Sequence, residues 1–258
     1  MTASSPLWPA RLHHLEIRSP RPEALAAFYR DVLGMRAEPV AGSWLLAGAE
    51  RRLVIAEGEA RSLGFAAYAV ADRDSLERLR RHVGGRGTLL EPSPTALFAE
   101  DAFAVRDPDG NRFVFGTASE AAGAADPLPG RLQHLVFTSR DARALAGFHE
   151  DVLGFAVSDR VRDDGGDLTA CFLRSDPEHH SLAVFRAAER RFDHHSYETS
   201  GWNDLRDWAD RFASFRTEIW WGPGRHGPGN DLFFMVRDPD GNNLEFSAEL
   251  ERRERDAP

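Results

Sequence analysis

The chain has 258 residues, 42% of them hydrophobic and 28% charged, which fits a folded soluble protein of about two domains. Its net charge of -9 argues against a nucleic-acid surface, and no apolar run approaches the length of a membrane helix. The single cysteine, Cys171, excludes an intrachain disulfide, and the N-terminal segment has no signal-peptide pattern. We therefore expect a cytoplasmic protein that binds neither nucleic acid nor membrane.

The first half of the chain predicts two strand-helix-strand units. An alternating strand over 12–19 leads to a helix whose apolar face contains Leu25, Phe28, Val32 and Leu33, with Gly34 as its stop. Short strands are expected at 43–48 and 51–57. The pattern then restarts with a strand at 64–70, a helix with a Leu76, Leu79 and Val83 stripe that Gly84 and Gly85 end, and strands at 101–107 and 111–116.

The second half repeats this order. Its first helix has an apolar face of Leu145, Phe148, Val152 and Leu153, and its second a face of Leu205, Trp208, Ala209 and Phe212. The expected strands are 134–139, 167–173, 181–185, 194–199, 230–236 and 242–247. A module of one strand, one helix and three strands therefore occurs four times.

Two motifs show that the halves are copies. FYRDVLGM at 28–35 returns as FHEDVLGF at 148–155, and RDPDGNRFVF at 106–115 returns as RDPDGNNLEF at 237–246. Each DPDGN predicts a tight turn, because Asp-Gly suits positive φ. An Ala-, Gly- and Pro-rich stretch separates the copies. We expect an N-terminal domain at 1–118 without metal ligands, a linker at 119–130 and a metal-binding catalytic domain at 131–258.

Three polar side chains of the second half fall at matching strand positions. Strand alternation puts His134 and His194 on the same kind of face, and Glu245 between two core residues must point away from that core. If the modules curl into one cup, the three could meet on its floor. Two imidazoles and one carboxylate form the facial triad suited to non-haem Fe(II), although Mn or Zn would also accept them.

The first copy provides an internal control for this hypothesis. His14 matches His134, but Phe65 stands where the second copy has His194, and Val114 where it has Glu245. These positions therefore need no polar residue for folding. A bound metal explains why the second half has polar residues there.

The chain resembles the vicinal-oxygen-chelate superfamily, and within it the type I extradiol ring-cleaving dioxygenases. The resemblance covers nearly the whole chain and rests on five motifs: HLVF at His134, HHSLA at His179, DHHSYE at Asp193, GPGRHGPGN at Gly222 and DPDGNNLE at Asp238. It implies an α+β fold of four βαβββ modules, paired into two tandem domains. Each domain would be a curled sheet, an open barrel, with its helices outside.

Site residues follow from the same resemblance. His134, His194 and Glu245 match the family's ligands for Fe(II), with Mn(II) as the other candidate; His194 is chosen over His195 because the pattern His-x-x-aromatic-Glu begins there. The family has a histidine beside the metal on the preceding strand, which we match to His180, with His179 as the alternative.

The His of GPGRH is His226, which the resemblance places against the substrate oxygens. His180 would act as the acid or hydrogen-bond donor near bound O2, since imidazole suits proton transfer near neutral pH. His149, His179 and His195 are otherwise assigned to the core or the surface.

Two positions depart from the family pattern. Met235 replaces the tyrosine that usually stands ten residues before the ligand Glu, and Trp221 replaces the arginine of homoprotocatechuate-type members. An aromatic wall at Trp221 would suit a more apolar substrate.

The favoured function is an oxidoreductase of aromatic catabolism that inserts O2 into a catecholic ring at mononuclear Fe(II). Its partners would be an aromatic diol, O2 and further copies of the chain in a homo-oligomer. The catechol, the cleaved bond and the choice of Fe or Mn stay open. Two alternatives are another metal-dependent enzyme of the superfamily, such as a glyoxalase-like isomerase, lyase or thiol transferase, and a non-catalytic protein that binds an aromatic ligand.

Overall fold

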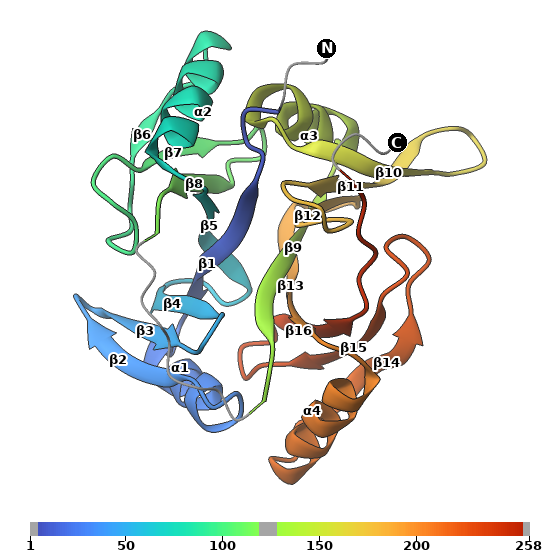
Figure 1. Cartoon of the computed structure of the whole chain (residues 1–258). Coiled ribbons are helices and arrows are strands. Elements are labelled where there is room, and N and C mark those ends of the chain that lie inside the picture. Colours follow the sequence, from blue (N-terminus) through green and yellow to red (C-terminus); the bar gives the residue numbers. More distant parts are fainter. Residues whose placement is uncertain (1–4, 119–127, 255–258) are drawn as a thin grey trace.

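A computed structural model describes residues 5–118 and 128–254. The strands of these residues form two eight-stranded sheets, one in each half of the chain (Figure 1). The linker predicted at 119–130 lies mostly outside the described residues. No helix within the described residues is long and apolar enough to cross a membrane.

The N-terminal half consists of two βαβββ modules. The elements of the first are β1 (Ala10–Ser19), α1 (Pro22–Asp31), β2 (Arg36–Val40), β3 (Ser43–Ala47) and β4 (Arg52–Glu57). The elements of the second are β5 (Ser62–Val70), α2 (Arg73–Gly85), β6 (Glu91–Pro92), β7 (Phe103–Arg106) and β8 (Arg112–Gly116).

The C-terminal half repeats this arrangement. The elements of its first module are β9 (Arg131–Ser139), α3 (Ala142–Phe148), η1 (His149–Leu153), β10 (Ala156–Arg162), β11 (Leu168–Arg174) and β12 (Leu182–Arg186). The elements of its second are β13 (Arg191–Thr199), α4 (Trp202–Ser214), β14 (Ile219–Arg225), β15 (Leu232–Arg237) and β16 (Asn243–Ala248).

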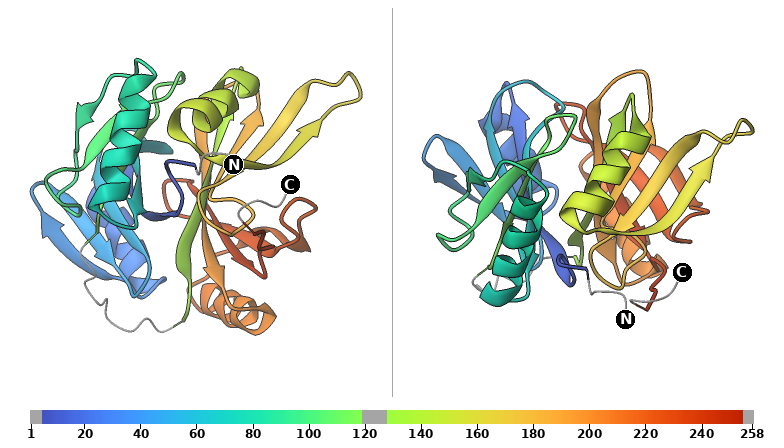
Figure 2. Two further views of the ribbon diagram at one scale, coloured as in Figure 1. Left: turned by 45° about the horizontal axis from the view of Figure 1, so that its top comes forward. Right: turned by 90° about the horizontal axis from the view of Figure 1, so that it is seen from above.

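The strand order explains how each sheet curls. It runs β2-β3-β4-β1-β5-β8-β7-β6 in the first sheet and β10-β11-β12-β9-β13-β16-β15-β14 in the second. In each sheet the first strands of the two modules pair antiparallel at the centre, and each pairs parallel with the last strand of its own module. The helices lie on the outside (Figure 2). This confirms the predicted fold of four βαβββ modules in two open, curled sheets.

The helices pack the faces that the sequence predicted. In α4, for example, Leu205, Trp208 and Phe212 are buried. Helix α3 differs from prediction, because it continues as the π-helical turn η1 before Gly154 ends it with φ 84°. Helix α2 runs through Gly84 and Gly85, and the left-handed residue that follows it is Gly87. The apolar periodicity of the sequence does not distinguish the π-helical turn η1 from an ordinary α-helical turn.

Matched contacts join the two halves. Tyr29 of α1 donates to Asp238 Oδ2 at 3.2 Å, while His149 Nε2, at the position equivalent to Tyr29, lies 3.4 Å from Asp107 Oδ2. Asp107 and Asp238 are themselves equivalent residues of the two DPDGN turns. The DPDGN turn of each half is therefore contacted by a residue from the first helical segment of the other half.

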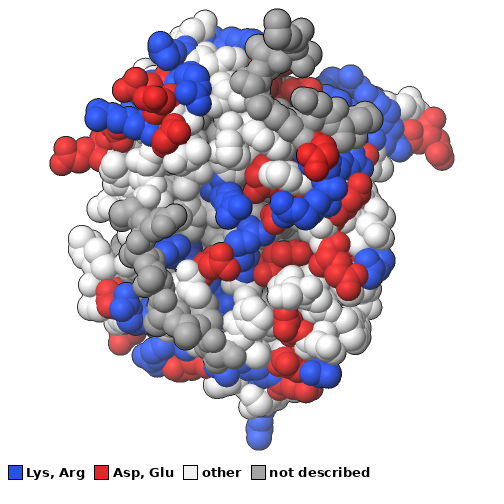
Figure 3. Space-filling model, viewed as in Figure 1, with Lys and Arg blue, Asp and Glu red and all other residues white. Residues whose placement is uncertain are grey.

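Charged residues of both signs lie on the surface. On the face shown in Figure 3, arginines and acidic residues are interspersed over both halves. This distribution fits the net charge of -9 and shows no broad basic patch on that face.

Candidate metal centre

Three adjacent strands of the second sheet place His134, His194 and Glu245. On β13, Ser196 pairs with His134 of β9 on one side and with Glu245 of β16 on the other. His194 stands two residues before Ser196 and therefore on the same face. The small Ser196 side chain between them leaves room for the three larger ones to lean together.

The ligand atoms of these three residues lie within 4.8 Å of one another, and all three residues are buried. Glu245 Oε1 is 3.3 Å from His134 Nε2, yet it has no hydrogen-bond partner among the described residues. A buried carboxylate oxygen without a partner is costly in an interior. A cation between the carboxylate and the two imidazoles would remove this cost.

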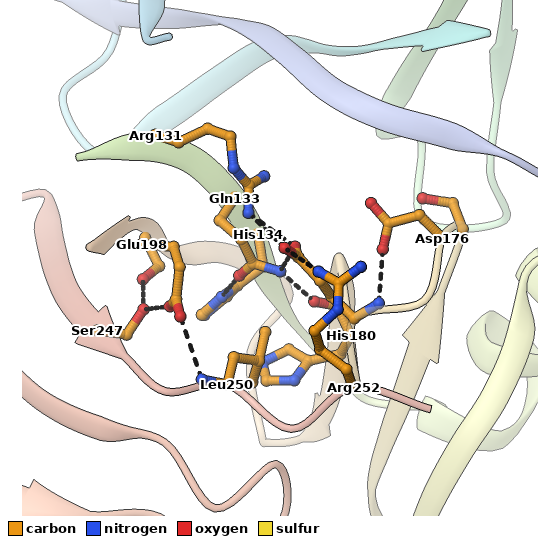
Figure 4. A network of polar contacts seen from close by, with 12 residues as sticks. Arg131, Gln133, His134, Asp176, His180, Glu198, Ser247, Leu250 and Arg252 are labelled. Carbon is orange, nitrogen blue, oxygen red and sulfur yellow. Dashed lines mark hydrogen bonds and ion pairs between the residues drawn. The ribbon is translucent and has the colours of Figure 1, made fainter. Parts of the chain in front are cut away.

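Neighbouring side chains orient both imidazoles. Gln133 Oε1 contacts His134 Nδ1, and Asp193 Oδ2 lies 2.9 Å from His194 Nδ1. Because Gln133 donates its amide to the carbonyl of His180 at 2.6 Å, its oxygen must be the atom that faces His134 (Figure 4). Both Nδ1 atoms are thus engaged as donors, which leaves each Nε2 with a lone pair for a metal.

The charge states also suit metal binding. Burial lowers the pKa of His134, so that its ring is neutral near pH 7. Burial raises the pKa of Glu245, but the imidazoles of His134 and His226 outweigh it and hold that pKa well below its ordinary value. The neutral His134 ring, the His194 imidazole and the Glu245 carboxylate therefore form a donor set that fits Fe(II), Mn(II) or Zn(II).

A cavity of about 150 Å³ opens above these residues. Besides the three candidate ligands, His180 and His226 line it. The remaining walls are Val136, Phe172, Phe185, Trp221, Pro228 and Met235. Both positions that depart from the family pattern, Trp221 and Met235, thus face this space, whereas Trp220 packs against Arg237, whose guanidinium carbon lies 4.2 Å from its ring centroid.

His180 and His226 approach the cluster from two connecting segments, one before β12 and one after β14. The ring centroid of His180 is 4.4 Å from that of His134. His226 stacks on Phe233 at 3.7 Å, and its Nε2 lies 3.1 Å from Glu245 Oε2. Burial lowers the pKa of His226, but the hydrogen bond and charge of Glu245 raise it above its ordinary value overall.

The other histidines of this half lie away from the cavity walls. His195 points into the core, where it stacks on Phe192, and burial lowers its pKa to about 3. His149 packs edge-on against Phe113 between the two halves. His179 lies behind His180 and contacts Asp159.

Sequence reasoning missed Asp231. This residue is fully buried, its ligand atom lies within 4.8 Å of those of His226 and Glu245, and neither carboxylate oxygen has a hydrogen-bond partner among the described residues. Burial, together with the charge of Glu245, raises its pKa to about 7. The sequence places Asp231 at the start of the strand expected at 230–236, where one carboxylate gives no signal that it is buried beside Glu245.

The first sheet has an apolar cluster at the equivalent position. Phe65 and Val114 pack with Phe98, Ala67 and Ala104, and His14 Nε2 contacts Thr95 Oγ1 at 2.9 Å. The register agrees with the sequence comparison, since Ala67 pairs with both His14 and Val114 as Ser196 does with His134 and Glu245. Among the described residues, the candidate ligand set is thus found in the second half and not at the equivalent positions of the first.

Comparison with known proteins supports a relationship over both halves. The family described as the glyoxalase/bleomycin resistance protein/dioxygenase superfamily matches residues 11–115 and 131–246. A metapyrocatechase of Pseudomonas sp. (strain CF600) is 29% identical, and the match covers 90% of this chain and 83% of the relative. Metapyrocatechase 2 of Cupriavidus necator is 30% identical, and the match covers 76% of this chain and 67% of the relative. The Mn(II)-bound glyoxalase from Novosphingobium aromaticivorans has a TM-score of 0.81 and 26% identity, covering 96% of this chain and 86% of the other.

Proposed function

The chain belongs to the glyoxalase/bleomycin resistance protein/dioxygenase superfamily, and within it we propose an extradiol ring-cleaving dioxygenase acting on a catechol and O2. The observation that carries this proposal is the convergence of His134, His194 and Glu245 at the floor of an apolar cavity. The similarity to two metapyrocatechases supports it.

We assign the metal to these three residues, as Fe(II) with Mn(II) as the alternative. When bound, the metal supplies a Lewis acid for the diol and an open position for O2. The protein contributes orientation and exclusion of water. The neutral His180 ring and the His226 imidazole flank the cavity and can hydrogen-bond the diol oxygens, while Phe172, Phe185 and Trp221 shield the ring from solvent.

The cavity favours a catechol without a charged substituent. No Arg or Lys lines it among the described residues, and the walls away from the histidines are aromatic or aliphatic. A carboxylated catechol would lose hydration here without gaining an ion pair. We therefore expect alkyl- or aryl-substituted catechols to be the better substrates.

Oxygen uptake tests the activity directly. Purified protein is loaded with Fe(II) without oxygen and then mixed with aerated catechol, 3-methylcatechol or 2,3-dihydroxybiphenyl. We expect O2 consumption and a yellow ring-opened product in equal amounts. His14→Ala, in the first sheet, is the matched control and should keep the activity. Absence of O2 uptake with the whole series would reject the proposal.

A glyoxalase-type isomerase is the second candidate. The similarity to the Mn(II)-bound glyoxalase favours it, and Asp231 places a second carboxylate close to Glu245, as proton abstraction in such an enzyme would need. The two candidates differ in their need for oxygen. Conversion of a glutathione hemithioacetal under nitrogen by the Mn(II) or Zn(II) form, without O2 uptake on any catechol, would select the isomerase.

A further inference from the structure

A pair of side chains backs His180 on the side away from the cavity. His179 Nδ1 lies 3.0 Å from His180 Nδ1, and His179 Nε2 lies 2.7 Å from Asp159 Oδ2 on β10. The His179 side chain is fully buried, while 40% of the Asp159 side chain is exposed. The chain Asp159–His179–His180 thus runs from the surface to the cavity wall.

The hydrogen bonds of this chain determine where the ring protons lie. A carboxylate only accepts hydrogen bonds, so His179 must hold its proton on Nε2 and donate it to Asp159. Burial lowers the pKa of His179, which leaves its ring neutral and its Nδ1 an acceptor. His180 Nδ1 must then be the donor. With its ring proton on Nδ1, directed at His179, the His180 imidazole has a free lone pair on its cavity-facing Nε2.

We infer that Asp159 and His179 are positioning residues that hold His180 in the Nδ1–H tautomer, so that its cavity-facing Nε2 accepts a hydrogen bond from the substrate. The inference rests on the proposed function for the identity of that substrate, a diol whose hydroxyl groups can donate. This acceptor differs from the donor role that the resemblance implied for His180, because the only ring proton lies on Nδ1, directed at His179. The inference also separates the two residues of HHSLA, with His180 at the cavity and His179 behind it.

Other segments hold the pair in place. The backbone N–H of His179 donates to Glu251 O at 2.8 Å, and Arg253 donates to Ser158 O at 2.9 Å while its guanidinium lies 3.4 Å from Asp159 Oδ2. A β-carbon at Gly229, which has φ 83°, would lie 3.2 Å from His179 Nδ1. The C-terminal segment 249–254 and the loop after His226 therefore both close over His179.

The first half shows that folding does not require such a pair. Leu53 pairs with Leu15 as Leu182 pairs with Leu135, so Glu50 and Arg51 occupy the positions of His179 and His180. Arg51 uses its guanidinium to bind the carbonyls of Leu33 and Gly130. The same strand start thus has a purely structural role in one copy and borders the cavity in the other.

Nitrogen-15 NMR of the metal-free protein tests the tautomer without any turnover. In protein labelled with 15N-histidine, a His180→Gln variant identifies the His180 signals. We expect a protonated Nδ1 and an unprotonated Nε2 for His180 in the parent protein. His179→Leu should give a mixture of tautomers, whereas His179→Gln should keep the parent state, because its side-chain oxygen can accept from His180 and its amide can donate to Asp159.

Two further variants make the test independent of damage to the core. Asp159→Ala removes the partly exposed outer end of the Asp159–His179–His180 hydrogen-bond chain and should also yield mixed tautomers. Asp164→Ala, in the β10–β11 turn, should leave the His180 tautomer unchanged. An Nε2–H tautomer at His180 in the parent protein, or an unchanged tautomer in both His179→Leu and Asp159→Ala, would overturn the inference.

Kinetics then connects the tautomer with catalysis. We expect His179→Leu to lower kcat/KM for catechol by about 10-fold at unchanged metal content, and His179→Gln to recover most of it. If the parent protein shows the expected tautomer but consumes no O2, the proposed function fails and the positioning pair stands. If the parent protein turns over catechol and His179→Leu has the same kcat/KM, the positioning role fails and the proposed function stands.

Discussion

Asp231 and Glu245 place two carboxyl groups close together in the interior of the second half, with ligand atoms within 4.8 Å of each other and of His226. Glu245 keeps its charge because imidazoles surround it, whereas burial and the charge of Glu245 raise the pKa of Asp231 to about 7. Like charges at short distance cannot both be accommodated without a counter-charge. The metal-free protein should therefore be sensitive to the ionisation of Asp231.

The expected pH dependence has a definite sign. The folded-state pKa of Asp231 lies above the ordinary value of 3.8, so its stabilising contribution is present at low pH and is lost as the pH rises to about 7. Asp231→Asn removes this loss. We predict that the variant gains on the order of 1–2 kcal/mol of unfolding free energy relative to the parent between pH 5 and pH 8.

Urea denaturation of both proteins after chelation, across that pH range, measures the difference directly. Titrating groups remote from Asp231 contribute equally to the two proteins and cancel in the comparison, so the difference reports Asp231 together with its coupled neighbours Glu245 and His226. A difference independent of pH would mean that Asp231 is paired in solution.

Trp221 tests the preference for uncharged catechols. It lines the cavity, and 48% of its surface is exposed, so an arginine at this position could reach water as well as the substrate. Trp221→Arg should improve kcat/KM for 3,4-dihydroxyphenylacetate relative to 3-methylcatechol by about 10-fold, because it supplies an ion pair for the carboxylate. Trp220→Arg, outside this cavity, is the control. An unchanged ratio of the two kcat/KM values in the Trp221 variant would mean that the substituent of the catechol ring does not lie against Trp221.

The candidate ligands could be predicted from the sequence because the chain contains its own control. His194 and Glu245 stand where the first copy has Phe65 and Val114, and alternation gives their face. Asp231 and Asp159 could not be predicted, since their role depends on loop and edge-strand paths that no periodic pattern encodes. The sequence had also left His179 and His180 as alternatives, because only the structure shows which one lines the cavity.

At the scale of elements, the DPDGN turns do more than reverse the chain. Asp238 accepts a hydrogen bond from Tyr29 of the other half, and Asp107 lies against His149 in the equivalent place. Each helix end therefore fixes the turn before the last strand of the opposite sheet. For β16, that strand contains Glu245.

Removal of one of these contacts should weaken the packing between the two halves without affecting the candidate metal ligands. Tyr29→Phe leaves the buried ring in place and removes only the hydroxyl that donates to Asp238. We predict a loss of about 1 kcal/mol in unfolding free energy, measured by urea denaturation, with unchanged metal content. Tyr68→Phe, which removes a hydroxyl bonded to Ser181 O, offers a second buried phenol for comparison. No loss in the Tyr29 variant would show that this contact contributes little.

The elements themselves followed the sequence pattern where one face is buried. The central strands and all four helices were predicted, as was the count of three strands after each helix. The strands β2, β6, β10 and β14 were not located, because each lies at a sheet edge and has few buried residues. The η1 turn was missed because the apolar residues around it have the same spacing as those of α1, which has no π-helical turn.

At the scale of the whole molecule, the half without candidate ligands supports the half that has them. Tyr68 of β5 donates to Ser181 O at 2.8 Å, next to His180 in the chain, and Ser175 Oγ joins Ala10 O to Ser181 Oγ. The first sheet thus holds the segment that leads into the cavity wall. The duplicated scaffold thus has an apolar cluster around Phe65 in one copy and a polar cluster around Glu245 in the other.

Metal content measured by plasma mass spectrometry tests the central claim of this account most directly. The parent protein and the matched variant His14→Ala, loaded with Fe(II) without oxygen and then desalted, should each retain close to one metal ion per chain. His194→Ala and Glu245→Gln should retain at most about a tenth of that amount, because each removes one of only three protein ligands. Equal metal content in the parent protein and in both ligand variants would contradict a cation held by His134, His194 and Glu245.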